Sequence, residues 1–348
     1  MPKKTLTVGE VSAAPGELKW GNATWAELRD STRVYLPVIL ANGAEDGPTI
    51  TILGGTHPTE HIPIHSLQIL LREKLDVKKL KGRIIGFPIA NPFAQQFGEY
   101  VSPHDGVNMY NSYPGSKDGT VTQRFANFIW EEAAKKSDVV IDQHENVKDC
   151  LYFITMETAG DAKTQAKAME LAEAFGLTII KSGKSSENMP AVYAEKGGIP
   201  LPVLAMKSGI PSFIAEYEAT TDIRFNEKDD LGIRVALKGL KNILKKEGMI
   251  PGKVEKQTEI KVLKGNYVAW GMNVSKRGGL TRRLVHTGEK LKKGTPITDI
   301  YDPFGNVIER IEMPIDGYLW GWNVGVPPWW NWSVASGDPI AFIFEDEK

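Results

Sequence analysis

Two kinds of apolar pattern alternate along residues 1–250. Short runs rich in Val, Ile and Leu, bounded by Gly, Pro, Asn or Asp, predict buried strands at 33–40, 49–53, 83–92, 137–146, 177–180 and 210–218. Apolar residues spaced three and four apart predict helices at 65–75, 123–136, 163–174 and 231–247. Strand, helix and strand within residues 49–92 form a βαβ unit, so we expect a parallel sheet flanked by helices.

The pattern changes after a linker containing Gly and Pro at 248–253. From residue 254 the chain shows short alternating strands and glycine turns, which is typical of a small all-β domain. The length of 348 residues exceeds the usual limit for one hydrophobic core, so we predict two domains, 1–250 and 254–348. For the Trp-rich stretch 321–332 we favour an interface between domains or subunits over a ligand-binding patch.

The first candidate for chemistry follows the strand at 49–53. Two glycines end that strand, and His57 and Glu60 come directly after them. Residues three apart on a first helical turn share one face, so these two side chains are expected to converge on one metal ion. Imidazole and carboxylate both suit Zn²⁺, and a catalytic zinc needs three protein ligands and one open position. The third ligand has to come from elsewhere in the chain.

Two other interpretations of this segment stay open from the residues alone. One is that they are solvated polar side chains at the start of a helix. The other is an H-x-x-E-H site, in which His57 and His61 bind zinc and Glu60 is the general base. That motif belongs inside a helix, whereas Pro58 suits only a first helical turn. We expect His61 and His65 to lie around the site or at the surface.

Two later strands end in further polar residues. The strand at 137–146 ends in Asp142 and His144, and ligands of open α/β sheets collect at the carboxyl ends of strands, so His144 is the candidate third ligand. Asp142 either orients an imidazole or caps a turn. The strand at 210–218 carries Glu216, a carboxylate that is costly at the end of a core strand unless it is used, and Glu218 on the same face competes with it.

Together these segments resemble the succinylglutamate desuccinylase/aspartoacylase family, which is related to the zinc carboxypeptidases. The family has a G-G-x-H-x-x-E motif, which Gly54, Gly55, His57 and Glu60 match. It has a D-x-H motif, which Asp142 and His144 match. It also has a G-I-P strand leading to a glutamate, which Gly209, Ile210, Pro211 and Glu216 match. The N-P pair at Asn91 and Pro92 and the polar loop at 105–115 are similar to further family motifs.

The resemblance implies a zinc-carboxypeptidase-like mixed sheet flanked by helices. It implies one Zn²⁺ per chain, held by His57, Glu60 and His144, and it favours Glu216 over Glu218 as the general base. Residues 302–321 look like the core of a C-terminal half-barrel similar to biotinyl/lipoyl carriers. Met313 and Pro314 stand where true carriers have a modifiable lysine, so we predict no lipoylation.

Departures from the family pattern concern the substrate. Tyr100 and Asn111 stand where the family places arginines for the oxyanion and the substrate carboxylate. Neither carries the permanent charge and bidentate fork of arginine, which weakens the prediction of acidic N-acyl amino acids as substrates. We expect Tyr100 to assist catalysis and the polar loop at 94–119, too long for a mere connector, to be functional. The expected substrate-binding residues are Asn91, Asn108, Tyr110 and Asn111, with Arg124 and Lys207 as cations to inspect.

We therefore predict a zinc-dependent hydrolase acting on linear amide bonds. It would remove an acyl group from an N-acyl amino acid or a related N-acyl amine, with Glu216 as base for metal-activated water. The alternatives are a non-hydrolytic binding protein that kept the zinc fold, and a carboxypeptidase acting on peptides.

Composition limits the other function classes. A net charge of −1 and mixed charges give no indication of a nucleic-acid or membrane partner. Cys150 is the single cysteine, which fits a reducing compartment, and the N-terminus lacks an apolar signal region. We expect a cytoplasmic protein with a small-molecule N-acyl substrate, and the oligomeric state is left open.

Overall fold

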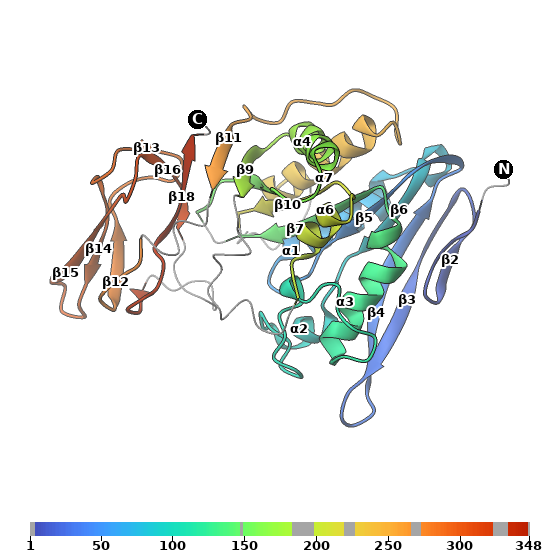
Figure 1. Ribbon diagram of the computed structural model, residues 1–348, viewed down its shortest axis with the longest axis horizontal. Helices are drawn as coiled ribbons and strands as arrows, with labels where there is room; N and C mark the ends of the chain where they lie inside the picture. Colours follow the sequence, from blue (N-terminus) through green and yellow to red (C-terminus); the bar gives the residue numbers. More distant parts are fainter. Residues whose placement is uncertain are drawn as a thin grey trace.

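A mixed sheet with helices on both faces forms the body of the protein in the computed structural model (Figure 1). The structure describes residues 4–146, 149–182, 198–218, 227–265, 273–322 and 333–346. In this part of the chain the main sheet has 12 strands. Their spatial order is β13 (Lys290–Leu291), β16 (Gly317–Trp322), β18 (Ala341–Asp346), β11 (Val262–Gly265), β9 (Thr178–Ser182), β8 (Phe153–Glu157), β10 (Ser212–Tyr217), β7 (Val139–Glu145), β5 (Glu45–Leu53), β6 (Lys81–Phe87), β4 (Arg33–Asn42) and β3 (Glu17–Glu27).

The centre of this sheet is parallel, as the βαβ pattern predicts. Strand β5 pairs in parallel with β6 and with β7, and β7 pairs in parallel with β10. Antiparallel neighbours flank this centre, because β4 pairs with β6 and β8 with β10 in that sense. The carboxyl ends of β5, β7 and β10 therefore meet at one edge of the sheet. The predicted mixed sheet flanked by helices is confirmed.

Helices cover the two faces of the sheet and bury two apolar clusters. One cluster contains α1 (His61–Ile69), α4 (Ala162–Phe175) and α7 (Leu231–Lys246), and the other contains α2 (Pro92–Phe97), α3 (Val121–Glu132) and α6 (Leu201–Lys207). A two-stranded hairpin, β1 (Leu6–Val8) and β2 (Val11–Ala13), packs with the second cluster. None of the described helices is long and apolar enough to span a membrane.

The described residues after 254 form strands, as the alternating pattern predicts. We call residues 262–346 the C-terminal β region. It has a four-stranded sheet of β15 (Val307–Glu312), β14 (Pro296–Tyr301), β12 (Gly279–Arg283) and β17 (Ser333–Val334). Its other strands, β11, β18, β16 and β13, extend the main sheet beyond β9 (Figure 1). The domain boundary and the similarity to biotinyl/lipoyl carriers stay predictions, and residues 323–332 of the Trp-rich stretch lie outside the described residues.

Two local predictions were wrong in ways that matter for the site. The helix predicted at 65–75 begins at His61, and its last turn, Leu70–Lys74, is a π-helix. His57 therefore lies in a turn before α1, and Glu60 is the N-cap residue. The predicted loop at 94–119 contains most of α2 and a 3₁₀ turn at Met109–Asn111. Strand β8 and helix α6 were not predicted.

Glycines connect the end of β5 to the end of β6. Gly54 accepts from Ala90 N at 2.9 Å, and Gly55 accepts from Asn91 N at 3.0 Å. Gly55 has φ +60°, and a Cβ there would lie 2.9 Å from Pro88 O. Only glycine combines this left-handed backbone with so close an approach.

We predict that Gly55→Ala lowers the free energy of unfolding by roughly 2–5 kcal/mol, from left-handed strain and overpacking together. Gly98→Ala is the matched control, because Gly98 has φ +64° with nothing within 4 Å of an added Cβ. It should lose only the strain, about 1–2 kcal/mol. Urea unfolding of both variants measures the difference, and equal losses would contradict the role of close packing.

Candidate metal centre and active site

Three buried side chains converge where β5 and β7 end. His57, Glu60 and His144 are 2%, 4% and 3% exposed. Glu60 Oε1 lies 2.6 Å from His57 Nδ1, Glu60 Oε2 lies 2.9 Å from His144 Nδ1, and the two Nδ1 atoms are 3.3 Å apart. Among the described residues this is the one group of His, Cys, Asp and Glu whose ligand atoms all lie within 4.8 Å of one another.

The outer nitrogen of each imidazole faces an oxygen. His57 Nε2 donates to Asn108 Oδ1 at 3.3 Å, and His144 Nε2 lies 3.2 Å from Asp142 Oδ2. Such oxygen partners orient metal-binding histidines, and they leave both Nδ1 atoms facing each other. Between the two predicted roles of Asp142, its distance to His144 favours orientation of the imidazole.

The donor set fits a zinc ion. Atoms at 2.0–2.1 Å from a tetrahedral ion lie roughly 3.3 Å apart, which agrees with the separation of the two Nδ1 atoms, 3.3 Å. Burial alone raises the pKa of Glu60, but the His57 and His144 imidazoles lower it to about 2. Glu60 is therefore a carboxylate, as a metal ligand has to be. Two imidazoles and one carboxylate leave one position of a tetrahedron for water or substrate.

The geometry that brings His57 to Glu60 differs from the predicted one. The two residues are joined by a turn in which Glu60 N donates to His57 O at 3.4 Å. Helix α1 starts only at His61, and its Ile62 N donates to the Glu145 carboxylate of β7. Glu145, 9% exposed, thus joins the start of α1 to the strand of His144. Glu145 was not among the predicted site residues, although its place beside His144 on a buried strand was a signal.

Glu216 lies on the neighbouring strand, level with His144. The two residues are register partners in the parallel β10 and β7 pair. Removal from water raises the pKa of Glu216 to about 7; His144 opposes this shift, and the charges of Glu60 and Asp142 add to it. A side-chain hydrogen bond with Asn146 favours the ionised form. The competing Glu218 instead accepts from Asp149 N at 2.9 Å.

Two tyrosines contact the histidines. The Tyr100 ring stacks on His57 with centroids 3.8 Å apart and planes at 16°. Tyr110 meets His144 edge to face, with centroids 5.3 Å apart. The polar loop that carries both tyrosines therefore lies against the two imidazoles, and Asn108 of the same loop bonds to His57.

The other predicted substrate residues have structural contacts. Asn91 caps α2 by accepting from Ala94 N at 3.2 Å, and its buried Nδ2 has no hydrogen-bond partner within the described chain. Asn111 is 7% exposed and ends the 3₁₀ turn beside Tyr110.

The remaining histidines are not part of the cluster of ligand atoms, and the two candidate cations have other surroundings. His61 and His65 lie on α1 with ring centroids 6.3 Å apart, and His61 is not part of the described cluster, which argues against the H-x-x-E-H interpretation. Arg124 donates from Nε to Gly119 O, and Lys207 is exposed at the end of α6. His104 lies edge-on to the rings of Phe93 and Phe97.

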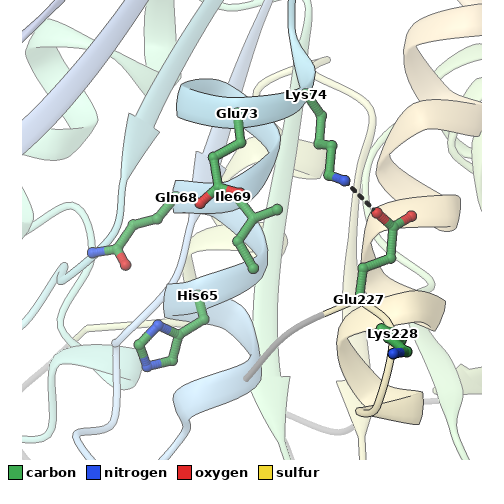
Figure 2. A pocket seen from close by; sticks show the side chains of 7 residues that line it. All are labelled: His65, Gln68, Ile69, Glu73, Lys74, Glu227 and Lys228. Carbon is green, nitrogen blue, oxygen red and sulfur yellow. Dashed lines mark ion pairs between the residues drawn. The ribbon is translucent and has the colours of Figure 1, made fainter. Parts of the chain in front are cut away.

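A separate pocket is lined by residues of α1 and the turn that follows it and by Glu227 and Lys228, as Figure 2 shows. It has a volume of about 540 Å³, and a Lys74–Glu227 ion pair of 2.7 Å lies at its wall. Its lining residues are His65, Gln68, Ile69, Glu73, Lys74, Glu227 and Lys228. None of these residues is a predicted metal ligand or catalytic residue. The candidate active site is therefore the buried group of His57, Glu60 and His144.

Comparisons with known proteins agree with these motifs. A family model described as Succinylglutamate desuccinylase/Aspartoacylase catalytic domain matches residues 46–200. The N-alpha-acetyl-L-2,4-diaminobutyric acid deacetylase of Halomonas elongata is 28% identical over 318 residues, which cover 90% of this chain and 86% of that protein.

Solved structures share the fold over nearly the whole chain. A succinylglutamate desuccinylase/aspartoacylase from Rhodobacter sphaeroides has a TM-score of 0.80 at 22% identity, covering 99% of both chains. The product-bound ectoine utilization protein EutE (DoeB) from Ruegeria pomeroyi has a TM-score of 0.81 at 21% identity, covering 98% of this chain and 99% of that one. The similarity thus includes the C-terminal β region.

We predict that the protein purified without added metal holds about one zinc per chain and that His144→Ala loses it, because two remaining ligands hold the ion weakly. Elemental analysis measures this. His61→Ala is the control, since His61 lies next to Glu60 but outside the cluster, and it should keep the metal. Zinc retained by His144→Ala and lost by His61→Ala would overturn the ligand assignment.

Proposed function

Because the chain belongs to the succinylglutamate desuccinylase/aspartoacylase family, we propose that it is a zinc-dependent amidohydrolase that removes an acyl group from an N-acyl amino acid or a related N-acyl amine. The observation that carries the proposal is the convergence of His57, Glu60 and His144 beside Glu216. A buried three-ligand site next to a carboxylate of raised pKa is the arrangement that hydrolysis by activated water requires.

In this proposal His57, Glu60 and His144 are the residues that would hold a zinc ion. When bound, zinc supplies a Lewis acid that brings the pKa of water toward about 7. Asn108 and Asp142 keep the two imidazoles oriented for this task. The buried surroundings exclude bulk water and strengthen the electrostatic contacts within the site.

Glu216 moves the proton. Its carboxylate takes a proton from the attacking water and returns that proton to the leaving amine, so that the amide C–N bond breaks and the acid and amine are released. A pKa of about 7 suits both directions of transfer near neutral pH. The hydrogen bond with Asn146 holds the carboxyl group at the end of β10.

Tyr100 is assigned to the oxyanion that forms at the substrate carbonyl. Its ring stacks on His57 and therefore lies beside the group formed by His57, Glu60 and His144. A phenol donates a hydrogen bond to a developing negative charge but adds no positive charge of its own. Tyr110, packed edge-on against His144, and Asn91, Asn108 and Asn111 complete the proposed substrate contacts.

The substrate proposed is an N-acyl amine that is not anionic at its side chain. Tyr100 and Asn111 replace the arginines that the family resemblance leads us to expect. The Halomonas relative is named for N-alpha-acetyl-L-2,4-diaminobutyric acid, whose parent amino acid carries a second amino group. Aromatic rings beside the site are compatible with such a cation.

We predict that N-acetylated diamino acids are hydrolysed at least about tenfold faster, in kcat/KM, than N-acetylaspartate or N-succinylglutamate, because Tyr100 and Asn111 offer the extra carboxylate no guanidinium. Release of the free amine from a panel of these compounds measures the ranking. A preference for the dicarboxylic substrates would contradict the assignment of Tyr100 and Asn111. If no compound of the panel is hydrolysed, the result would favour a non-hydrolytic binding protein. If C-terminal residues are released from peptides, the result would favour a carboxypeptidase.

We predict that Glu216→Gln lowers kcat by about 10²–10⁴-fold with zinc content unchanged, because the amide cannot accept the proton. Glu218→Gln, two residues away, keeps an oxygen for the Asp149 N–H and should lose far less. Turnover and elemental analysis of the same samples separate chemistry from metal loss. A larger loss in Glu218→Gln than in Glu216→Gln would reverse the assignment of the base.

A further inference from the structure

The segment Asp149–Leu151 joins the C-terminal β region to the strands of the active site. It lies between β7, which carries His144, and β8, which pairs with the strand of Glu216. Its side chains and backbone are bonded on one side to β12 and β16 and on the other side to Glu218. The proposed mechanism makes no use of these contacts.

On the side of the C-terminal β region, the Asp149 carboxylate has two partners. It pairs with the Arg283 guanidinium at the end of β12, and its Oδ1 accepts from Thr287 Oγ1 at 2.8 Å. Thr287 Oγ1 also lies 3.2 Å from Asp149 O. We call these three residues the Asp149 clamp. Asp149 has φ +59°, a left-handed backbone that a residue other than glycine keeps only where its surroundings hold it.

The next two residues extend the contact along the backbone. Leu151 N donates to Trp320 O at 3.0 Å, Trp320 Nε1 donates to Leu151 O at 3.1 Å, and Cys150 forms an antiparallel bridge with Gly321. A Cβ on Gly321 would lie 2.6 Å from Cys150 Sγ. Strand β16 therefore packs against this segment without room for a side chain.

On the side of the active site, the same segment supports the end of β10. Asp149 N donates to Glu218 Oε1 at 2.9 Å, two residues beyond Glu216. Asn146 N donates to Tyr217 O at 2.6 Å. Burial raises the pKa of Cys150, and the charges of Glu216, Glu218 and Asp149 raise it further. The Asp149 clamp is thus linked to the proposed base through the Asp149–Glu218 hydrogen bond and the two residues of chain from Glu218 to Glu216.

We propose that the C-terminal β region is a working part of the active site, in which Asp149 and Arg283 are positioning residues for Glu216. The clamp fixes the segment 149–151, this segment fixes Glu218, and Glu218 holds the end of the strand that carries the base. This inference rests on the proposed deacylase function for its kinetic consequence. Displacement of a reacting group by about 1 Å costs about 10²-fold in rate, so a loose clamp lowers kcat rather than substrate binding.

The kinetic test compares two arginines of the C-terminal β region. Arg283→Met removes the clamp charge and keeps an apolar chain for the packing against Trp322. Arg310→Met is the matched control, because Arg310 pairs with Asp299 at 2.7 and 2.8 Å within the same region. With zinc content confirmed, kcat should fall about 10–100-fold in Arg283→Met, with KM within about threefold of wild type, and stay near wild type in Arg310→Met.

Two further variants distinguish positioning from general loss of stability. Arg283→Lys restores a positive charge near Asp149 and should recover part of the lost kcat. Asp149→Asn tolerates the left-handed backbone, and combining it with Arg283→Met should add little to either single change, since both break one contact. Full additivity of the two effects, or equal kcat in Arg283→Met and Arg310→Met, would overturn the proposal.

The single cysteine supplies a readout that needs no activity. Cys150 is 3% exposed, so its thiol should react slowly with a disulfide reagent in the native protein and at least about tenfold faster in Arg283→Met, with Arg310→Met unchanged. If wild type hydrolyses no N-acyl amine, the proposed function fails while this measurement still decides the clamp. Equal rates of thiol reaction in wild type and Arg283→Met would show that the Asp149 clamp does not hold this segment. A faster thiol reaction in Arg283→Met with unchanged kcat would show that the clamp does not position Glu216.

Discussion

The arrangement of the whole centre depends on one electrostatic constraint, the burial of the Glu60 carboxylate between two imidazoles. A buried carboxylate is costly unless positive charge or hydrogen-bond donors compensate it. Here His57 and His144 lie 2.6 and 2.9 Å from its two oxygens. The outer nitrogens of both rings face oxygens of Asn108 and Asp142. Each imidazole therefore has a Glu60 oxygen near its Nδ1 and another oxygen near its Nε2.

Parallel pairing of β5, β7 and β10 satisfies this constraint. Because neighbouring parallel strands end at the same edge, Glu60, His144 and Glu216 come together although 156 residues of sequence separate Glu60 from Glu216. The glycine turn after β5 brings the backbone of residue 55 against the loop after β6. The same turn that leads to His57 and Glu60 thus also joins the two strands of the first βαβ unit.

Much of this arrangement could be predicted from local pattern, and the rest depends on contacts that local pattern does not contain. The strands at 49–53, 137–146 and 210–218 were evident from their apolar runs. The rule on strand ends then indicated His144, and it left Glu216 and Glu218 as alternatives between which only the family resemblance chose. The predicted helical turn for His57 was wrong because that residue lies in the turn before α1. The Ile62 N–H of this helix bonds to Glu145, a residue 83 positions away in the sequence. The pairing of β11 with β9 could not be predicted either, because the apolar pattern of a strand does not indicate which distant strand it pairs with.

The main sheet connects the C-terminal β region to the strands that carry His144 and Glu216. Strand β10 is bordered by β7, which carries His144, and by β8, and from β8 the sheet runs through β9 and β11 to β18 and β16. Strand β16 then contacts Cys150 and Leu151, the residues that lead into β8. The sheet and the direct contact at 149–151 thus form two routes between the same elements. A carboxyl group whose pKa of about 7 depends on its exclusion from water needs surroundings that do not shift, and two independent attachments restrict such movement more than either would alone.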